Sequence, residues 1–366
     1  ENRMGFNIAT VTTAEAAAVI KGIYPFVKKP VFLWGTYGVG KSSIVESIRD
    51  SLSEDTGQKW GLKDVRASQF TAVDTRGIPI VKTDKDGHNR ANFALPDWLP
   101  YVERDGENGI LFLDELLLGN ASVQAAFYQL LNDGRLGDYI LPENWFCVAA
   151  SNRPEDGASA LVGRKPDAAL MTRFGTHLNI AASVPSWTEW AASHDIEPEV
   201  IAFIQFRGSP NGDQAGLLHE FPEGGVKKDQ IAIATPRTWE NVSGILKSKL
   251  PEVLESKTIQ GAIGLAAASE FLAFLKILRK VPSFLEIFDN PDEVAIPPDL
   301  SLRYAVTAQL AAKVTLKDIA NSVSWIKRID DELVAVFFTL LTVRDDSFKS
   351  CPEYVQFKIE NSKNVI

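Results

Sequence analysis

A phosphate-binding pattern lies near the start of the sequence. The residues from Gly35 to Ser42 fit G-x-x-x-x-G-K-[ST], the spacing of a loop that cradles nucleotide phosphates. Glycines let the backbone turn its N–H groups toward phosphate oxygens, a lysine reaches the β- and γ-phosphates, and a serine hydroxyl ligates Mg²⁺. The pattern therefore predicts a nucleoside triphosphate site in which Lys41 binds phosphate and Ser42 binds the metal.

Two acidic residues close a second apolar run. Ile110-Leu-Phe-Leu is followed by Asp114 and Glu115, and α/β sheets place their ligand chemistry at the carboxyl ends of strands. We expect Asp114 to hold Mg²⁺ together with Ser42, and Glu115 to act as the general base that polarises the attacking water. By itself an Asp-Glu pair after a strand is most often a surface end, so this prediction depends on the phosphate loop.

The other elements must position these residues at one edge of a sheet. The loop follows the apolar residues 31–34 and precedes a helical pattern that begins at Ser43, and a helix N-terminus adds partial positive charge beside phosphate. The predicted nucleotide-binding set is Gly35, Thr36, Tyr37, Gly38, Val39, Gly40, Lys41, Ser42, Ser43 and Asp114.

Short β-rich runs alternate with helical patterns in the first half of the chain, which predicts parallel βαβ units. The expected strands cover residues 31–34, 65–70, 110–113, 146–151 and 176–180. From residue 186 the pattern is helical, with a loop rich in Gly and Pro over 208–225 and one long helix over 258–276. We expect an α/β core over 1–183, a helical region over 184–280 and a helical C-terminal extension over 281–366.

In this order, the motifs resemble the MoxR-like group of AAA+ ATPases. After the phosphate loop and Asp114-Glu115 come Ala149-Ala-Ser-Asn152-Arg, Ala169-Leu-Met-Thr-Arg173-Phe and Thr235-Pro-Arg237-Thr-Trp. The resemblance covers most of the chain. It implies an α/β fold with an AAA+ P-loop NTPase core and a five-stranded parallel sheet, and a helical lid over 184–280. It also implies ATP and Mg²⁺ as cofactors, ATP hydrolysis, and a homo-oligomeric ring that is usually a hexamer.

The resemblance assigns roles to three further residues. Asn152 matches the first sensor, whose amide orients the lytic water or touches the γ-phosphate. Arg173 matches the arginine finger that completes the site of a neighbouring subunit, although Arg164 and Arg153 are near enough in sequence to share or take that role. Arg237 matches the second sensor at the start of a lid helix, where it contacts the γ-phosphate of its own subunit.

Two hairpins are expected within the core. Residues 78–81 and 92–95 flank a turn at 84–87, and a second turn-rich stretch covers 132–138. The resemblance implies that the first hairpin is an insert in the second helix that projects toward the pore of the ring, and that the second hairpin precedes the first sensor. The alternative for both is a solvated edge hairpin.

The composition argues against nucleic acid as a partner. Lys and Arg number 38 against 47 for Asp and Glu, which gives a net charge of −9, whereas proteins that bind the phosphate backbone are normally basic. Cys147 and Cys351 lie in unrelated segments, and Cys147 falls in an apolar run, so we expect a packed thiol at Cys147 and a reducing, cytoplasmic compartment. No apolar run reaches the roughly 20 residues of a membrane span.

Three functions remain compatible with these residues. The first is an ATP-driven ring that remodels or matures a protein client, for which the resemblance implies a partner carrying a von Willebrand factor A domain. The second is a nucleic-acid-directed AAA+ motor, which the acidic balance disfavours. The third is a nucleotide-gated scaffold that hardly hydrolyses ATP, which the presence of Lys41, Asp114, Glu115 and Asn152 disfavours.

Overall fold

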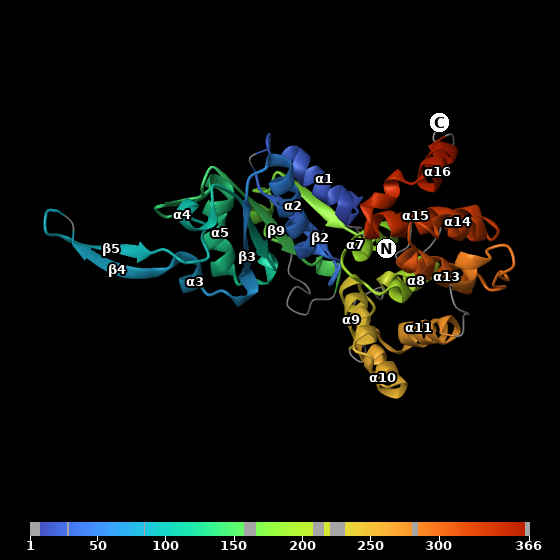
Figure 1. Cartoon of the computed structure of the whole chain (residues 1–366). Coiled ribbons are helices and arrows are strands. Elements are labelled where there is room, and N and C mark those ends of the chain that lie inside the picture. Colours follow the sequence, from blue (N-terminus) through green and yellow to red (C-terminus); the bar gives the residue numbers. More distant parts are fainter. Residues whose placement is uncertain are drawn as a thin grey trace. The chain divides into compact units, whose positions relative to one another are not determined.

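The chain folds into two compact units. A computed structural model describes residues 8–27, 29–83, 85–156, 166–207, 216–219, 231–279 and 285–362. Of these, the first unit contains the residues up to Ala181 and the second contains those from Ala182 onward (Figure 1). Within the described part of the chain, no helix is both long and apolar enough to cross a membrane.

The first unit is built on a parallel sheet. Its strands lie in the order β1 (Thr10–Val11), β10 (Thr176–Ile180), β2 (Val31–Gly35), β9 (Asn144–Ser151), β6 (Asn108–Asp114) and β3 (Trp60–Arg66). The expected fold class, a parallel α/β core followed by helices, is confirmed, and β1 adds a sixth strand at one edge. All six pair in parallel, so their carboxyl ends meet at one edge of the sheet.

One expected strand is displaced. The run at 65–70 predicted a strand, but β3 ends at Arg66 and the chain turns into a short 3-10 helix, Ala67–Gln69. Because β3 is an edge strand, it carries polar residues such as Asp64 and Arg66 on its exposed side. Because of these polar residues, β3 is not a continuous apolar run in the sequence.

The first unit also contains helices, several of which have the caps and apolar stripes that the sequence provides. They are α1 (Thr13–Ile23), α2 (Lys41–Thr56), α3 (Ala72–Arg76), α4 (Val102–Asp105), α5 (Ala121–Asp133) and α6 (Ala168–Met171). For example, α5 is capped at its start by Asn120, whose side chain accepts from the amides of Ser122 and Val123 at 3.1 and 3.0 Å. It is capped at its end by Gly134, where φ is +65°. Its buried stripe, which includes Phe127, packs into the core with Phe32.

Both expected hairpins are present. Strands β4 (Ile78–Thr83) and β5 (Asn89–Ala94) form an antiparallel ribbon that runs out from α3 away from the sheet (Figure 1). Asp84, in the expected turn, lies outside the described residues. The second hairpin pairs β7 (Arg135–Leu136) with β8 (Tyr139–Ile140). Its inner residues Leu136 and Tyr139 are buried, so this hairpin belongs partly to the core.

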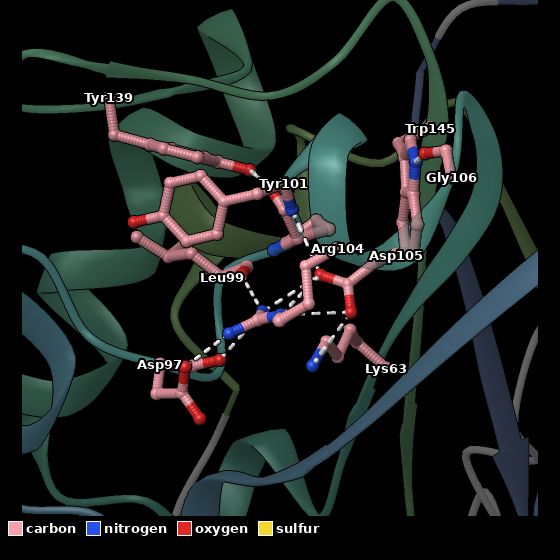
Figure 2. Close-up of polar contacts among 10 residues, drawn as sticks. Lys63, Asp97, Leu99, Tyr101, Arg104, Asp105, Gly106, Tyr139 and Trp145 are labelled. Carbon is pink, nitrogen blue, oxygen red and sulfur yellow. Dashed lines mark hydrogen bonds and ion pairs between the residues drawn. The ribbon is translucent and has the colours of Figure 1, made fainter.

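Polar contacts tie the returning end of the ribbon to the sheet (Figure 2). Arg104 donates to the carbonyls of Asp97 and Leu99 at 2.9 and 2.7 Å, and it pairs with the Asp105 carboxylate at 2.8 Å. Asp105 also pairs with Lys63 of β3 at 3.2 Å. The segment after the ribbon is therefore fixed to β3 through one arginine and one aspartate.

The same segment is attached to the second hairpin and to β9. The Tyr139 hydroxyl donates to the Pro100 carbonyl at 2.6 Å, and the Trp145 indole donates to the Gly106 carbonyl at 3.0 Å (Figure 2). Cys147 of β9 lies nearby in the core, and burial raises the pKa of its thiol to about 12. The expectation of a packed thiol is confirmed for Cys147.

The second unit is helical. Its helices are α7 (Val184–Ser193), α8 (Pro198–Arg207), α9 (Pro236–Lys247), α10 (Glu252–Ile263), α11 (Leu265–Leu278), α12 (Leu285–Asp289), α13 (Leu300–Lys313), α14 (Ile319–Lys327), α15 (Asp331–Arg344) and α16 (Pro352–Ser362). Trp239, Phe271 and Phe337 belong to one hydrophobic cluster, so the two helical regions expected from the sequence share a core. Of the loop expected over 208–225, only 216–219 lie among the described residues.

The prediction of one long helix over 258–276 is wrong. Two helices, α10 and α11, meet at Gly264, where φ is +84°. A Cβ at this position would lie 2.8 Å from the carbonyl oxygen of Ala232. The glycine therefore permits both a left-handed backbone and a close chain approach, and both end the helix.

Candidate nucleotide-binding site

Glycine conformations shape the phosphate loop between β2 and α2. Gly38 and Gly40 have φ values of +68° and +100°, which side-chain-bearing residues rarely adopt. At Gly35, a Cβ would lie 2.9 Å from Val39 Cγ1 and 3.2 Å from the Ile180 carbonyl oxygen. The loop is therefore a tight turn that leads directly into the N-terminus of α2, which is the geometry that suits an anion.

The Lys41 side chain folds back over this loop. Its Nζ donates to the carbonyl oxygens of Gly35 and Thr36 at 2.9 and 3.0 Å, and to Asn152 Oδ1 at 2.9 Å. The ammonium group thus lies between the phosphate loop and the strand β9, since Asn152 directly follows the last residue of that strand. This places a cation where the pattern requires contact with phosphate.

Ser42 and Asp114 face each other across the start of α2. The Ser42 hydroxyl lies 3.4 Å from Asp114 Oδ2, at the carboxyl end of β6. A hydroxyl and a carboxylate are the hard oxygen donors that Mg²⁺ prefers. Among the described residues, no group of three or more His, Cys, Asp or Glu side chains could hold a metal. The pair fits an ion that takes its other ligands from phosphate and water.

Glu115 has an unusual backbone and a partner that the sequence did not suggest. Its φ and ψ are 52° and 34°, in the left-handed region that costs energy for a residue with a side chain. Its amide donates to Asp114 Oδ1 at 2.8 Å, and its carboxylate accepts a hydrogen bond from the Ser68 hydroxyl. Ser68 lies in the short 3-10 helix that follows β3, the neighbour of β6, so the pairing depends on strand order.

Asn152 brings the phosphate loop and the acidic pair close together. Strand β9 lies between β2 and β6, and Asn152 is buried at its end. Its side chain bonds to Lys41 and also to Tyr37 of the phosphate loop. Burial raises the pKa of Tyr37, Asp156 and Glu115 add to the rise, and the Asn152 hydrogen bond opposes it. The Tyr37 hydroxyl is therefore neutral and lies among acidic groups.

The three candidate trans arginines differ in their surroundings. Arg153 is paired with the buried Asp156, with Nε at 3.2 Å from Oδ2 and Nη2 at 3.0 Å from Oδ1. Arg164 lies outside the described residues. Arg173 follows α6 and makes no ion pair with a carboxylate of the described chain; its guanidinium lies over the Tyr128 ring, with Cζ 4.5 Å from the centroid. Of the two described arginines, Arg153 has a direct ion pair, and Arg173 has a longer-range electrostatic attraction to Asp167.

Arg237 lies in the second unit, at the start of α9. Thr235 caps that helix by accepting from the Thr238 amide at 3.2 Å, and Pro236 occupies its first turn. The helix start expected there is confirmed. The role of Arg237 toward a nucleotide stays a prediction.

The structure brings five of the predicted site residues together in the first unit. Lys41, Ser42, Asp114, Glu115 and Asn152 lie at the carboxyl ends of β2, β6 and β9 and are linked by the contacts given above. This arrangement can bind a metal-chelated triphosphate, hold a carboxylate near an attacking water and orient that water with an amide.

Comparisons with known proteins gave matches among solved structures alone. Neither the protein-family models nor the curated proteins gave a match. Among solved structures, a RuvB mutant of Thermotoga maritima is 16% identical over 85% of each chain, with a TM-score of 0.38. NtrX of Brucella abortus in complex with ATP is 12% identical over 98% of this chain and 69% of that chain, with a TM-score of 0.38. Replication initiator DnaA bound to AMPPCP and single-stranded DNA is 13% identical over 98% and 96%, with a TM-score of 0.37. At these values the likeness identifies no activity.

Proposed function

We propose that this chain is a Mg²⁺-dependent ATPase of the AAA+ type, similar to the MoxR-like group, that works as a ring and remodels or matures a protein client. The observation that carries the proposal is the position of the Lys41 ammonium, 2.9 Å from both Gly35 O and Asn152 Oδ1. It joins the phosphate loop to the end of the central strand, beside Ser42 and Asp114.

Each side chain has a separate task in this proposal. Lys41 and the loop amides bind the β- and γ-phosphates, and Ser42 and Asp114 hold the metal. When bound, Mg²⁺ neutralises charge on the phosphates and fixes their orientation. Asn152 orients the attacking water, and the Glu115 carboxylate accepts its proton. Arg237, at the first turn of α9, would touch the γ-phosphate of its own subunit.

The ring supplies the remaining charge. Arg153 is paired directly with Asp156, whereas Arg173 has only a longer-range electrostatic attraction to Asp167, which supports Arg173 as the residue that reaches into a neighbouring subunit. A guanidinium aimed at the γ-phosphate stabilises charge that develops in the transition state.

The ribbon formed by β4 and β5 supports a polypeptide client. Ile78, Val81 and Phe93 are 62, 74 and 53% exposed, which is a high exposure for large apolar side chains on one hairpin. Apolar side chains of this kind suit an unfolded or partly folded protein segment. A partner carrying a von Willebrand factor A domain is a further part of this proposal, and it rests on the family resemblance alone.

One observation favours a nucleic-acid-directed motor as the second candidate. On the ribbon, Lys82 lies directly opposite Arg90. Both side chains are exposed, and exposed cations side by side are the residue type that contacts a phosphate backbone. The overall charge of −9 favours the protein client. ATPase assays with duplex DNA and with a reduced, alkylated model protein separate the two, because only the true partner should stimulate turnover.

The nucleotide site is tested by two substitutions. We expect Lys41→Ala to lose ATP binding, because a ground-state phosphate contact is removed, and Glu115→Gln to bind ATP but hydrolyse it about 100-fold or more slowly, because the base is removed. Fluorescent-nucleotide binding and phosphate release measure the two effects. The exposed residues Lys59 and Glu103 provide matched controls as Lys59→Ala and Glu103→Gln. Unchanged turnover in Glu115→Gln would remove the base role from that residue.

A further inference from the structure

The guanidinium of Arg173 is held in place by α5 and α6. It lies over the ring of Tyr128, with Cζ 4.5 Å from the centroid, and Nη1 donates to the Ala169 carbonyl. The Tyr128 hydroxyl donates in turn to Asp167, which caps α6 by accepting from the Ala169 amide at 2.8 Å. The direction of the Arg173 side chain is therefore fixed by Tyr128 and Ala169, and Asp167 lies near enough to attract its charge.

His177 controls the position of the turn from which Arg173 extends. The Trp34 indole donates to His177 Nδ1 at 3.2 Å, and His177 Nε2 lies 3.1 Å from the Met171 carbonyl. An indole nitrogen only donates, so Nδ1 must be the acceptor. The proton of the neutral ring is therefore on Nε2, which donates to Met171, the last residue of α6.

Three aromatic rings lie near the His177 ring and favour this orientation. Its centroid lies 5.7 Å from the ring centroids of both Phe32 and Phe174, and 6.3 Å from that of Trp34. Burial lowers the pKa of His177 and the hydrogen bond to the Met171 carbonyl opposes that shift, so the neutral form prevails at neutral pH.

The two partners of His177 belong to two different functional segments. Trp34 is the residue of β2 directly before Gly35, where the phosphate loop begins. Met171 lies two residues before Arg173, whose own amide donates to Leu170 O at 3.1 Å in the same turn. One side chain thus joins the strand of the chain's own phosphate loop to the turn that carries Arg173.

We propose that His177 is a positioning residue for Arg173. Through the Met171 carbonyl it sets the place of the turn, and Tyr128 sets the direction of the guanidinium. This inference rests on the proposed function, because it requires Arg173 to complete the site of a neighbouring subunit. A displacement of about 1 Å in such a group is enough to cost up to about 100-fold in rate.

Two substitutions separate the two hydrogen bonds of His177. In His177→Asn the amide oxygen lies near the former Nδ1 and still accepts from Trp34, but the side chain is too short to reach Met171. In His177→Gln the amide nitrogen reaches Met171, and the acceptor for Trp34 is lost. We expect the Asn variant to lower kcat for ATP about 10- to 100-fold with KM unchanged, and the Gln variant to retain nearly full activity.

A double substitution tests whether His177 acts through Arg173. In the Arg173→Ala background, His177→Asn should cause no further loss of kcat, because the residue that it positions is already gone. Three results would each overturn the inference. They are a double variant whose loss of kcat is the product of the two single losses, equal losses in the Asn and Gln variants, and a raised KM in the Asn variant.

Mixed rings distinguish this inference from the proposed function. A Lys41→Ala chain mixed with an Arg173→Ala chain should recover activity, because the first supplies the arginine and the second supplies the intact site. Adding His177→Asn to the Lys41→Ala chain should remove the recovery, and adding it to the Arg173→Ala chain should not. If His177→Asn removes the recovery equally from either chain, the inference about His177 is wrong, but the trans role of Arg173 stands. A failure of the parent mixture, with rings formed, overturns the trans role of Arg173 and the inference with it.

Discussion

Glu115 has a strained backbone and a carboxylate that a hydrogen bond holds in place. Its backbone is in the left-handed region, and its carboxylate oxygen Oε2 accepts a hydrogen bond from the Ser68 hydroxyl. A general base needs a free carboxylate oxygen facing the water. In the arrangement described here, Ser68 competes with that water for the base.

We therefore expect Ser68→Ala to raise the basal ATPase rate. The loss of one hydrogen bond, worth about 1 kcal/mol, corresponds to about a fivefold increase if the bound carboxylate is the inactive form. Phosphate release measured at saturating ATP checks this change. Ser68→Thr keeps the hydroxyl and serves as the control. A lower rate in Ser68→Ala would show that the serine orients Glu115 toward water instead.

The residues that the sequence predicted differ from those that it missed in how they depend on the fold. Lys41, Ser42 and Asp114 lie in local patterns whose spacing fixes their geometry. Ser68 and His177 have no such pattern, because each has a partner, Glu115 or Trp34, that is distant in sequence. Their partners follow from the pairing of β3 with β6 and of β10 with β2, which only the folded sheet defines.

At the scale of elements, α4 anchors the ribbon through a carboxylate with a strongly lowered pKa. Burial alone would raise the pKa of Asp105, but hydrogen bonds from Arg104, the Tyr101 amide and Lys63 bring it from 3.8 to about 2. Because the folded pKa lies below the unfolded one, the carboxylate stabilises the fold above about pH 4. This contribution disappears as the pH falls toward 2.

Asp105→Asn should lower the free energy of unfolding by about 1–2 kcal/mol at pH 7, since three charge-assisted contacts are weakened. The difference from the wild type should shrink below about pH 4, where the wild-type carboxylate begins to lose its advantage. Urea unfolding at several pH values measures it. Asp97→Asn is the matched control, because Asp97 contacts the same Arg104 but its side chain is 97% exposed. Equal losses in the two variants would contradict the account.

Sequence patterns located most elements but misjudged where two of them end. The apolar run at 65–70 suggested a strand because Val65 and Phe70 are apolar, yet the chain leaves the sheet at Arg66. Around Gly264 the helical pattern continues on both sides, and only the close approach of the Ala232 carbonyl reveals the break. Both errors arise where a tertiary contact decides the boundary.

At the scale of the whole molecule, the proposed function requires an element that transmits hydrolysis to a client. The ribbon is the strongest candidate, because its apolar side chains are exposed and its base is fixed to β3 and β8 by Asp105 and Tyr139. A gripping element needs both an accessible surface and a rigid support. The ribbon combines the two within the first unit.

We expect the double variant Val81→Ser with Phe93→Ser to keep basal ATPase and assembly near the wild type. These side chains contribute little to the core because they are 74 and 53% exposed. Stimulation of ATPase by a reduced, alkylated model protein should fall several-fold, since about 1 kcal/mol of apolar contact is lost. Val253→Ser, at an exposed position of the second unit, is the control. Unchanged stimulation would assign the client to another surface.

The base of the ribbon is also a point at which the ribbon could be replaced by another hairpin. Ile78 and Ala94 are direct partners, so the two ends of the ribbon lie about 5 Å apart. At Gly77 a Cβ would come within 1.9 Å of the Ala94 carbonyl oxygen, which makes this glycine a fixed attachment point. Any antiparallel hairpin whose ends have the same spacing would fit there. The ribbon can therefore be replaced by another hairpin while the sheet and the candidate nucleotide site stay unchanged.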